Sequence, residues 1–139
     1  MFSAIDGQGR DPAWEVSDSC QGHPSPNSLY HYHILTNNDC LATDAAHNTT
    51  QETKLIGYAF DGFGIYSQYE GGKELMSADL DECHGHQGSV PWEGAVTDMY
   101  HYHITPDYPY TISCFRGTII DSPVNRAAWR RLNTPPPGV

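Results

Sequence analysis

Seven of the eight histidines in this chain belong to a short pattern that occurs twice. Each copy begins with Cys-x-Gly-His, at residues 20–23 and 83–86, and continues to Tyr-His-Tyr-His, at residues 30–33 and 100–103. Neutral imidazole is a common protein ligand for zinc and copper, and the repeated spacing places several imidazoles where they could share one site. The pattern therefore predicts a metal centre.

The two tetrapeptides are predicted to be β-strands that carry their histidines on one face. Side chains alternate along a strand, so the two histidines of a tetrapeptide project to the same side, roughly 6–7 Å apart, and the tyrosines to the other. Pairing of the two strands would converge four imidazoles. The expected ligands are His31, His33, His101 and His103. The expected auxiliary groups, which complete or orient the site, are His23, His84 and His86.

A set of nitrogen ligands suits copper or zinc. The competing interpretation gives the histidines a structural role, with their rings bonded to backbone carbonyls or stacked on tyrosines. The sequence lacks Gly-x-Ser-x-Gly and His-Glu-x-x-His, so catalysis would have to proceed through the metal. We therefore favour a binding or structural centre, with a copper-dependent oxidoreductase as an alternative.

Four carboxylates indicate a separate candidate site for calcium, which prefers oxygen ligands. They are Asp61, Asp79, Asp81 and Glu82. The alternative is a turn aspartate bonded to its own backbone beside a solvated acidic loop.

The four cysteines indicate two disulfides, because an even number frames the two copies in a domain with little charge. The repeat favours Cys20 with Cys40 and Cys83 with Cys114, while crossing pairs remain open. Disulfides predict an oxidising compartment, which is extracellular, on the cell surface or periplasmic. The sequon at Asn48 would carry a glycan in a eukaryotic source.

Length and charge restrict the organisation and the partners. The 139 residues predict one domain, and the net charge of −10 argues against nucleic acid as a partner. No run is long enough to span a membrane. We expect an N-terminal arm or edge strand at 1–19, a β domain at 20–117 with half-repeats 20–40 and 83–114, and a C-terminal segment with a Pro-rich tail at 118–139.

The predicted fold is mainly β: a single disulfide-stapled domain, sandwich-like or barrel-like, in which two pseudo-symmetric half-repeats share a core. At most one short helix is expected, at residues 126–132. Alternation and turn residues predict strands at 29–35, 55–60, 65–67, 100–104 and 110–115.

Further motifs accompany the repeated pattern: Gly-x-Ala-x-Asp-Gly-Phe-x-Ile-Tyr at 57–66, Leu-Asp-Glu-Cys at 80–83, and Pro-Tyr at 109–110 before Cys-x-x-Gly at 114–117. In this combination the chain resembles the YHYH domain family over residues 20–117. The resemblance implies a secreted or surface protein, and it implies no particular reaction.

A second hypothesis comes from a different functional class. Edge-prone strands, a Gly-rich arm, a Pro-rich tail and a glycan at Asn48 would suit a structural subunit that forms a homo-oligomer, filament or surface assembly.

Overall fold

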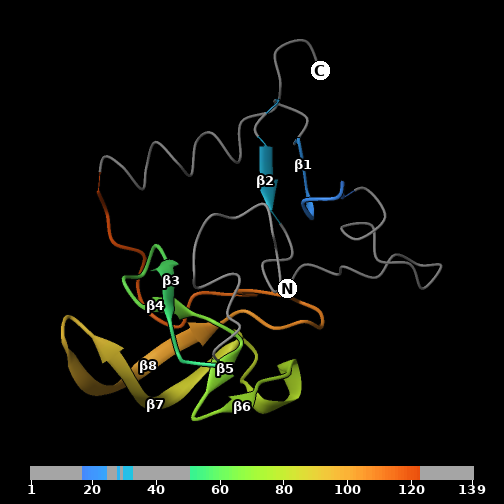
Figure 1. The fold of residues 1–139 in the computed structure, drawn as a ribbon. Coiled ribbons are helices and arrows are strands. Elements are labelled where there is room, and N and C mark those ends of the chain that lie inside the picture. The colour runs from blue at the N-terminus through green and yellow to red at the C-terminus, as the bar shows by residue number, and fades with distance from the viewer. Residues whose placement is uncertain (1–16, 25–27, 29, 33–50, 123–139) are drawn as a thin grey trace.

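The structure is a computed structural model, and it describes residues 17–24, 28, 30–32 and 51–122 (Figure 1). These residues are mainly β, as predicted, and their one helical element is the 3-10 turn η1 (Ser77–Asp79). Their strands form three sheets. Within this part of the chain no helix has the length and apolar character needed to cross a membrane. The helix predicted at 126–132 lies outside the described residues.

The largest sheet has four strands and combines two hairpins. The strand order is β3 (Leu55–Tyr58), β4 (Gly64–Tyr66), β8 (Ala95–His103) and β7 (Gly85–Trp92). β3 pairs with β4 and β7 pairs with β8 in antiparallel fashion, whereas β4 and β8 are parallel. The long β7–β8 hairpin, at the lower left in Figure 1, therefore forms one edge of the sheet.

Two short turns depend on backbone conformations that favour glycine. Glu93 and Gly94, between β7 and β8, have φ angles of 48° and 86°. Gly71 and Gly72 have φ angles of 58° and 78° and connect β5 (Tyr69–Glu70) to β6 (Lys73–Glu74). Two-residue turns with positive φ match the twist of antiparallel strands. The second turn fixes a small hairpin that carries Glu70.

The tyrosine face of β8 lies against the hydrophobic core. Tyr102 is fully buried and clusters with Ala59 and Cys83, and five partly buried side chains pack against them: Phe63, Ile65, Tyr100, Ile112 and Phe115. The Tyr102 hydroxyl donates a hydrogen bond to Asp61 (2.5 Å) and accepts one from the backbone N–H of Arg116 (2.7 Å). The predicted separation of tyrosines and histidines onto opposite faces therefore holds in β8.

Both copies of the repeated pattern fold into the same kind of hairpin. In the first copy, β1 (Gly22–Pro24) pairs with β2 (Tyr30–Tyr32), and His23 lies opposite His31. In the second copy, β7 pairs with β8, and His86 lies opposite His101. Each Cys-x-Gly-His element thus pairs with the tetrapeptide of its own copy.

The turn before β7 is organised by Asp81. Its Oδ1 accepts hydrogen bonds from the backbone N–H groups of Cys83 (2.9 Å) and Gly85 (3.2 Å). The Tyr100 hydroxyl donates to the same carboxylate at 3.0 Å. His84 takes a left-handed φ of 72° inside the turn. Asp81 therefore joins the turn to the tetrapeptide strand.

In the first copy, Asp18 joins the turn to the tetrapeptide strand in the same way as Asp81 does in the second. Its Oδ1 accepts from the backbone N–H groups of Cys20 (2.8 Å) and Gly22 (3.4 Å), and the Tyr30 hydroxyl donates to its Oδ2 at 2.7 Å. Gln21 has a φ of 60°, in the place that His84 takes in the second copy. The repeated unit therefore begins two residues earlier than the cysteine, with Asp-x-Cys-x-Gly-His.

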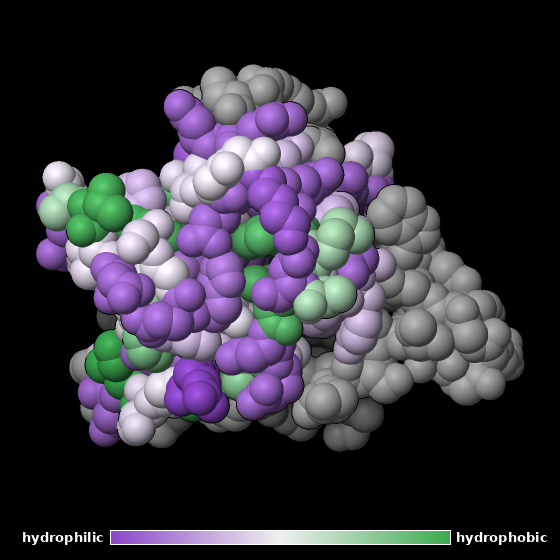
Figure 2. All heavy atoms as spheres, turned by 90° about the horizontal axis from the view of Figure 1, so that it is seen from below, coloured by the Kyte–Doolittle hydropathy of each residue, from purple (hydrophilic) through white to green (hydrophobic). Residues whose placement is uncertain are grey.

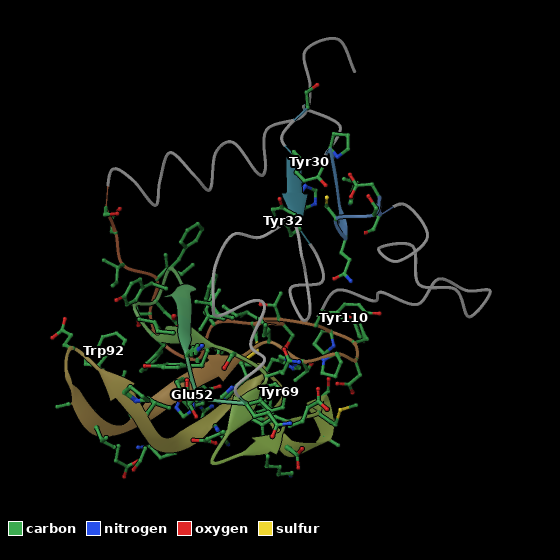
Figure 3. All side chains as sticks on the ribbon, in the orientation of Figure 1. Tyr30, Tyr32, Glu52, Tyr69, Trp92 and Tyr110 are labelled. Carbon is green, nitrogen blue, oxygen red and sulfur yellow. A yellow bond between two sulfur atoms is a disulfide. The ribbon has the colours of Figure 1, made fainter. Side chains whose placement is uncertain are left out.

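The two hairpins belong to separate sheets. Figure 1 shows β1 and β2 above the four-stranded sheet, and Figure 3 shows Tyr30 and Tyr32 on this upper hairpin, away from Trp92 on β7. The half-repeats are alike in local structure without their tetrapeptide strands pairing with each other in the described residues.

The strand predicted at 110–115 is wrong, because this segment consists of turns and bends. Pro109 has no backbone N–H to donate to a ladder, and Tyr110 takes a left-handed φ of 68°, which ends an extended conformation. The segment is held instead by Ser113, whose hydroxyl donates to the Glu82 carbonyl, and by the disulfide between Cys83 and Cys114.

The disulfide Cys83–Cys114 has the partners that the repeat predicts. The other predicted pair, Cys20 with Cys40, lies outside the described residues because Cys40 is not among them.

Removing the Cys83–Cys114 bridge is expected to cost much of the domain's stability. The bridge joins residues 31 apart, and closing a loop of this size stabilises by about 3–4 kcal/mol in the chain-entropy model. The double variant Cys83→Ala/Cys114→Ala should lose a similar amount in urea unfolding monitored by tryptophan fluorescence. A loss below about 1 kcal/mol would contradict this assignment.

Candidate metal centre

Two histidines on β8 point unprotonated ring nitrogens away from the tyrosine face. His101 Nδ1 lies 3.0 Å from the Met99 carbonyl oxygen, and His103 Nδ1 lies 2.6 Å from the Ser67 carbonyl oxygen. A carbonyl oxygen only accepts, so Nδ1 carries the proton in both rings and Nε2 keeps its lone pair. Metal-binding histidines are commonly oriented in this way, through a backbone carbonyl on the other nitrogen.

His86 and Glu70 bring two more ligand atoms to the same place. His86 lies on β7 opposite His101, and its Nε2 is 3.1 Å from His101 Nε2. Glu70 comes from the β5–β6 hairpin, and its Oε2 is 2.9 Å from His86 Nε2. Its Oε1 is 3.7 Å from His101 Nε2. Three separate chain segments therefore meet at this point.

The four side chains form a compact group. One ligand atom from each of Glu70, His86, His101 and His103 lies within 4.8 Å of the others. The ring centroids of the three histidines are 4.7, 4.8 and 5.1 Å apart. Ligands about 2.0–2.1 Å from a tetrahedral metal lie roughly 3.3 Å from one another, so movements of an ångström or so would complete a coordination sphere.

Within this group of four side chains, hydrogen bonding leaves one atom unexplained, His103 Nε2. The residue is fully buried, and this nitrogen has no hydrogen-bond partner in the structure. A buried polar atom without a partner costs roughly 1–3 kcal/mol. The atom faces the other three ligands of the group, where a metal ion would satisfy it.

Burial keeps the inner histidines neutral. It lowers the pKa of His103 to about 3, with further lowering by the neighbouring His101 and His86, although the bond to Ser67 acts in the opposite direction. Burial also lowers the pKa of His101. At neutral pH both lone pairs are therefore available without loss of a proton.

The centre is closed on one side and open on the other. The side chains of His101 and His103 are inaccessible to solvent, whereas those of His86 and Glu70 are 27% and 22% exposed. Gly88 leaves space here, since a Cβ at this position would lie 2.9 Å from Glu70 Oε1 and 3.2 Å from His101 Cε1. Figure 2 shows the molecule from below, and the described part of this face is mostly hydrophilic with small separate hydrophobic spots.

The structure gathers part of the predicted ligand set. His101 and His103 are in the group. His86, which was predicted as an auxiliary residue, also offers one of the four candidate ligand atoms. His84 lies elsewhere, with Nε2 2.9 Å from Thr105 Oγ1, and its burial lowers its pKa to about 4.

The first copy does not reach this group among the described residues. His23 and His31 contact each other on the separate β1–β2 hairpin, with ring centroids 4.5 Å apart. His33 and the sequon at Asn48 lie outside the described residues.

The carboxylates considered for calcium are spread over several hydrogen-bonded positions. Asp61 accepts from Tyr102 and from the Gly117 backbone, while Asp81 organises the turn before β7. Asp79 contacts Lys73 and accepts from the Met76 backbone. Within the described residues, none of these carboxylates belongs to the group of ligand atoms that could hold a metal.

Sequence reasoning missed Glu70 and Asp18. Glu70 stands alone in a polar stretch, and only the Gly-Gly turn after it indicates a hairpin. Asp18 could have been identified from the sequence, because Asp-x-Cys-x-Gly-His occurs at 18–23 and again at 81–86.

Comparison with known families gives one match that covers most of the chain. The family described as YHYH protein matches residues 14–75 and again residues 73–117. This chain belongs to the YHYH protein family. Together the two matches span residues 14–117 and so include both copies of the repeated pattern. No match was found among curated proteins, and none among solved structures.

Proposed function

We propose that this YHYH protein binds a zinc or copper ion through Glu70, His86, His101 and His103. Three imidazole nitrogens and one carboxylate oxygen suit either metal, and both form stable sites with such ligands. The role is binding or structural: the ion would join the β5–β6 hairpin to the two long strands β7 and β8.

The unpartnered Nε2 of His103 carries this proposal. A purely structural network accounts for the contacts of His86 with Glu70 and His101, because those atoms can share a proton. It leaves a fully buried lone pair facing three other ligand atoms. Metal binding would require His86 to move its proton from Nε2 to Nδ1, which a neutral imidazole can do.

Elemental analysis of the full chain tests the proposal. The protein would be purified without chelators or an affinity tag, and copper, zinc and calcium measured against protein concentration. Copper or zinc that is bound tightly and lost in a His101→Ala/His103→Ala variant supports the centre. Protein that binds neither metal when each is added in excess would exclude it and leave the histidines as a structural network.

Copper-dependent oxidation is the second candidate, and the exposed side of the centre favours it. A catalytic metal needs a position for water or substrate, and His86 with Glu70 lines the accessible side. Azide added to the Cu²⁺-loaded protein should change its visible spectrum if that position is open. An unchanged spectrum would restrict the centre to binding.

We further propose an extracellular, cell-surface or periplasmic location. The Cys83–Cys114 disulfide supports it, because structural disulfides persist in oxidising compartments, and YHYH family membership is consistent with it. Homo-oligomer formation, filament assembly and a glycan at Asn48 stay predictions from the sequence.

Stability of the metal-free protein should fall as the pH decreases from about 6.5 towards 4. The pKa values of His84 and His103 are lowered in the folded state, to about 4 and 3. In this pH range the two histidines bind protons in the unfolded chain but not in the folded chain. Lower pH therefore favours unfolding, and the free energy of unfolding falls by up to about 1.4 kcal/mol per pH unit for each histidine. Urea unfolding with chelator present measures this. A flat profile between pH 7 and 4.5 would contradict it.

A further inference from the structure

We infer that the first half-repeat holds a second metal ion, bound by His23 and His31. The choice of zinc or copper rests on the proposed function, but the ligands are different residues, so each site can fail without the other. The sequence prediction joined both copies in a single centre, whereas the structure separates them into two hairpins.

The two hairpins have the same strand register around their histidines. Gly22 lies opposite Tyr32 as Gly85 lies opposite Tyr102. One residue further along, His23 lies opposite His31, as His86 lies opposite His101. The two histidine pairs therefore occupy the same place in the same two-stranded unit.

Ring geometry supports this equivalence. The centroids of His23 and His31 are 4.5 Å apart with planes at 57°, and those of His86 and His101 are 4.7 Å apart with planes at 67°. His23 Nδ1 lies 3.1 Å from the Pro24 carbonyl oxygen, which can only accept, so Nδ1 carries the proton and Nε2 is the basic nitrogen of this ring. The first copy thus presents a prearranged imidazole pair.

The supporting contacts are duplicated as well. Asp18 binds the turn and Tyr30 in the first copy as Asp81 binds the turn and Tyr100 in the second. Each glycine is also closely approached: a Cβ on Gly22 would lie 2.8 Å from the His31 carbonyl oxygen. A unit that is repeated in its turn, its register and its histidine pair is expected to repeat its ligand chemistry.

The second site should be the weaker of the two. His23 and His31 are partly exposed, in contrast to the buried His101, and water competes better at exposed ligands. His33 stands in sequence where His103 stands in the second copy, but it lies outside the described residues, so the inference uses His23 and His31 alone.

Calorimetric titration of the metal-free full chain with Zn²⁺ tests the inference. Wild type should bind two ions with different affinities. His23→Gln/His31→Gln should lose the weaker ion and keep the tighter one. His101→Ala/His103→Ala should do the reverse, and His47→Ala, which removes the one histidine outside the pattern, should keep both.

The outcomes separate the two proposals. One ion in wild type, unaffected by His23→Gln/His31→Gln, would overturn the second site and leave the first. One ion that disappears only with His23→Gln/His31→Gln would support the second site and overturn the first. Both conclusions require folded variants, which the circular dichroism spectrum of each variant establishes, and a wild-type stoichiometry of one ion overturns the two-site inference without any variant.

Discussion

Replacing His103 by alanine is expected to abolish tight binding of zinc or copper at the centre on β7 and β8. His103 supplies a buried, neutral Nε2 that has no other partner. Loss of a residue that merely orients a metal ligand typically weakens binding 10–100-fold, so loss of a ligand should weaken it by at least about 100-fold. Competition against a chelator of known affinity measures the change.

His84→Ala is the matched control for this variant. Both substitutions remove a fully or nearly fully buried imidazole, so both should lower the free energy of unfolding through lost packing. His84 bonds to Thr105 and lies outside the ligand group, so its variant should keep the affinity for metal.

Thermal unfolding gives a second test of the same pair. An ion present at about 100 times its dissociation constant stabilises the folded state by about 2.7 kcal/mol. Added metal should therefore raise the melting temperature of wild type and His84→Ala but not that of His103→Ala, beyond any smaller effect of a second, weaker site. Equal responses of the two variants would exclude His103 as a ligand.

The sequence predicted the histidine face of β8 because that prediction uses only strand alternation. Tyr100 and Tyr102 pack on the core side, and His101 and His103 project to the other. The hairpin of β3 and β4 could also be predicted from the sequence, since Asp61 to Gly64 provide a turn between two apolar stretches.

The assembly of the centre could not be predicted from alternation alone. Glu70 reaches the histidines because the β5–β6 hairpin packs near β7, and no local pattern in the sequence encodes that placement. The sequence analysis expected the histidines of the two tetrapeptides to meet at one site, which assumed that the tetrapeptide strand of one copy pairs with that of the other. Each tetrapeptide instead pairs with the Cys-x-Gly-His element of its own copy, which requires closure of a shorter loop.

Gly85→Ala is expected to destabilise the second half-repeat strongly, because the added methyl group would meet the backbone of the neighbouring strand. A Cβ at this position would overlap the His101 carbonyl oxygen and lie 2.6 Å from the Tyr100 hydroxyl oxygen. Both neighbours are held in place, the first by the β7–β8 ladder and the second by Asp81. Overpacking a core typically costs about 1–3 kcal/mol, and an obstacle in the backbone itself should bring the loss to at least the upper end of this range.

Gly57→Ala provides the comparison, because a Cβ there meets nothing within 4 Å and Gly57 also lies in a strand. Alanine at such a site should change the free energy of unfolding by less than about 1 kcal/mol. Urea unfolding of the two variants measures the difference between them. A similar small effect at both positions would mean that β7 and β8 can separate at Gly85 without cost.

The Gly85 variant also connects the fold to the centre. If the strands do separate to accommodate the methyl group, His86 moves away from His101, and these two residues would supply ligand atoms from opposite strands. Metal affinity should then fall together with stability in Gly85→Ala, while Gly57→Ala keeps the affinity and changes the free energy of unfolding by less than about 1 kcal/mol. A Gly85→Ala protein that loses stability yet binds metal as tightly as wild type would show that the close approach of the two strands is not what positions the ligands.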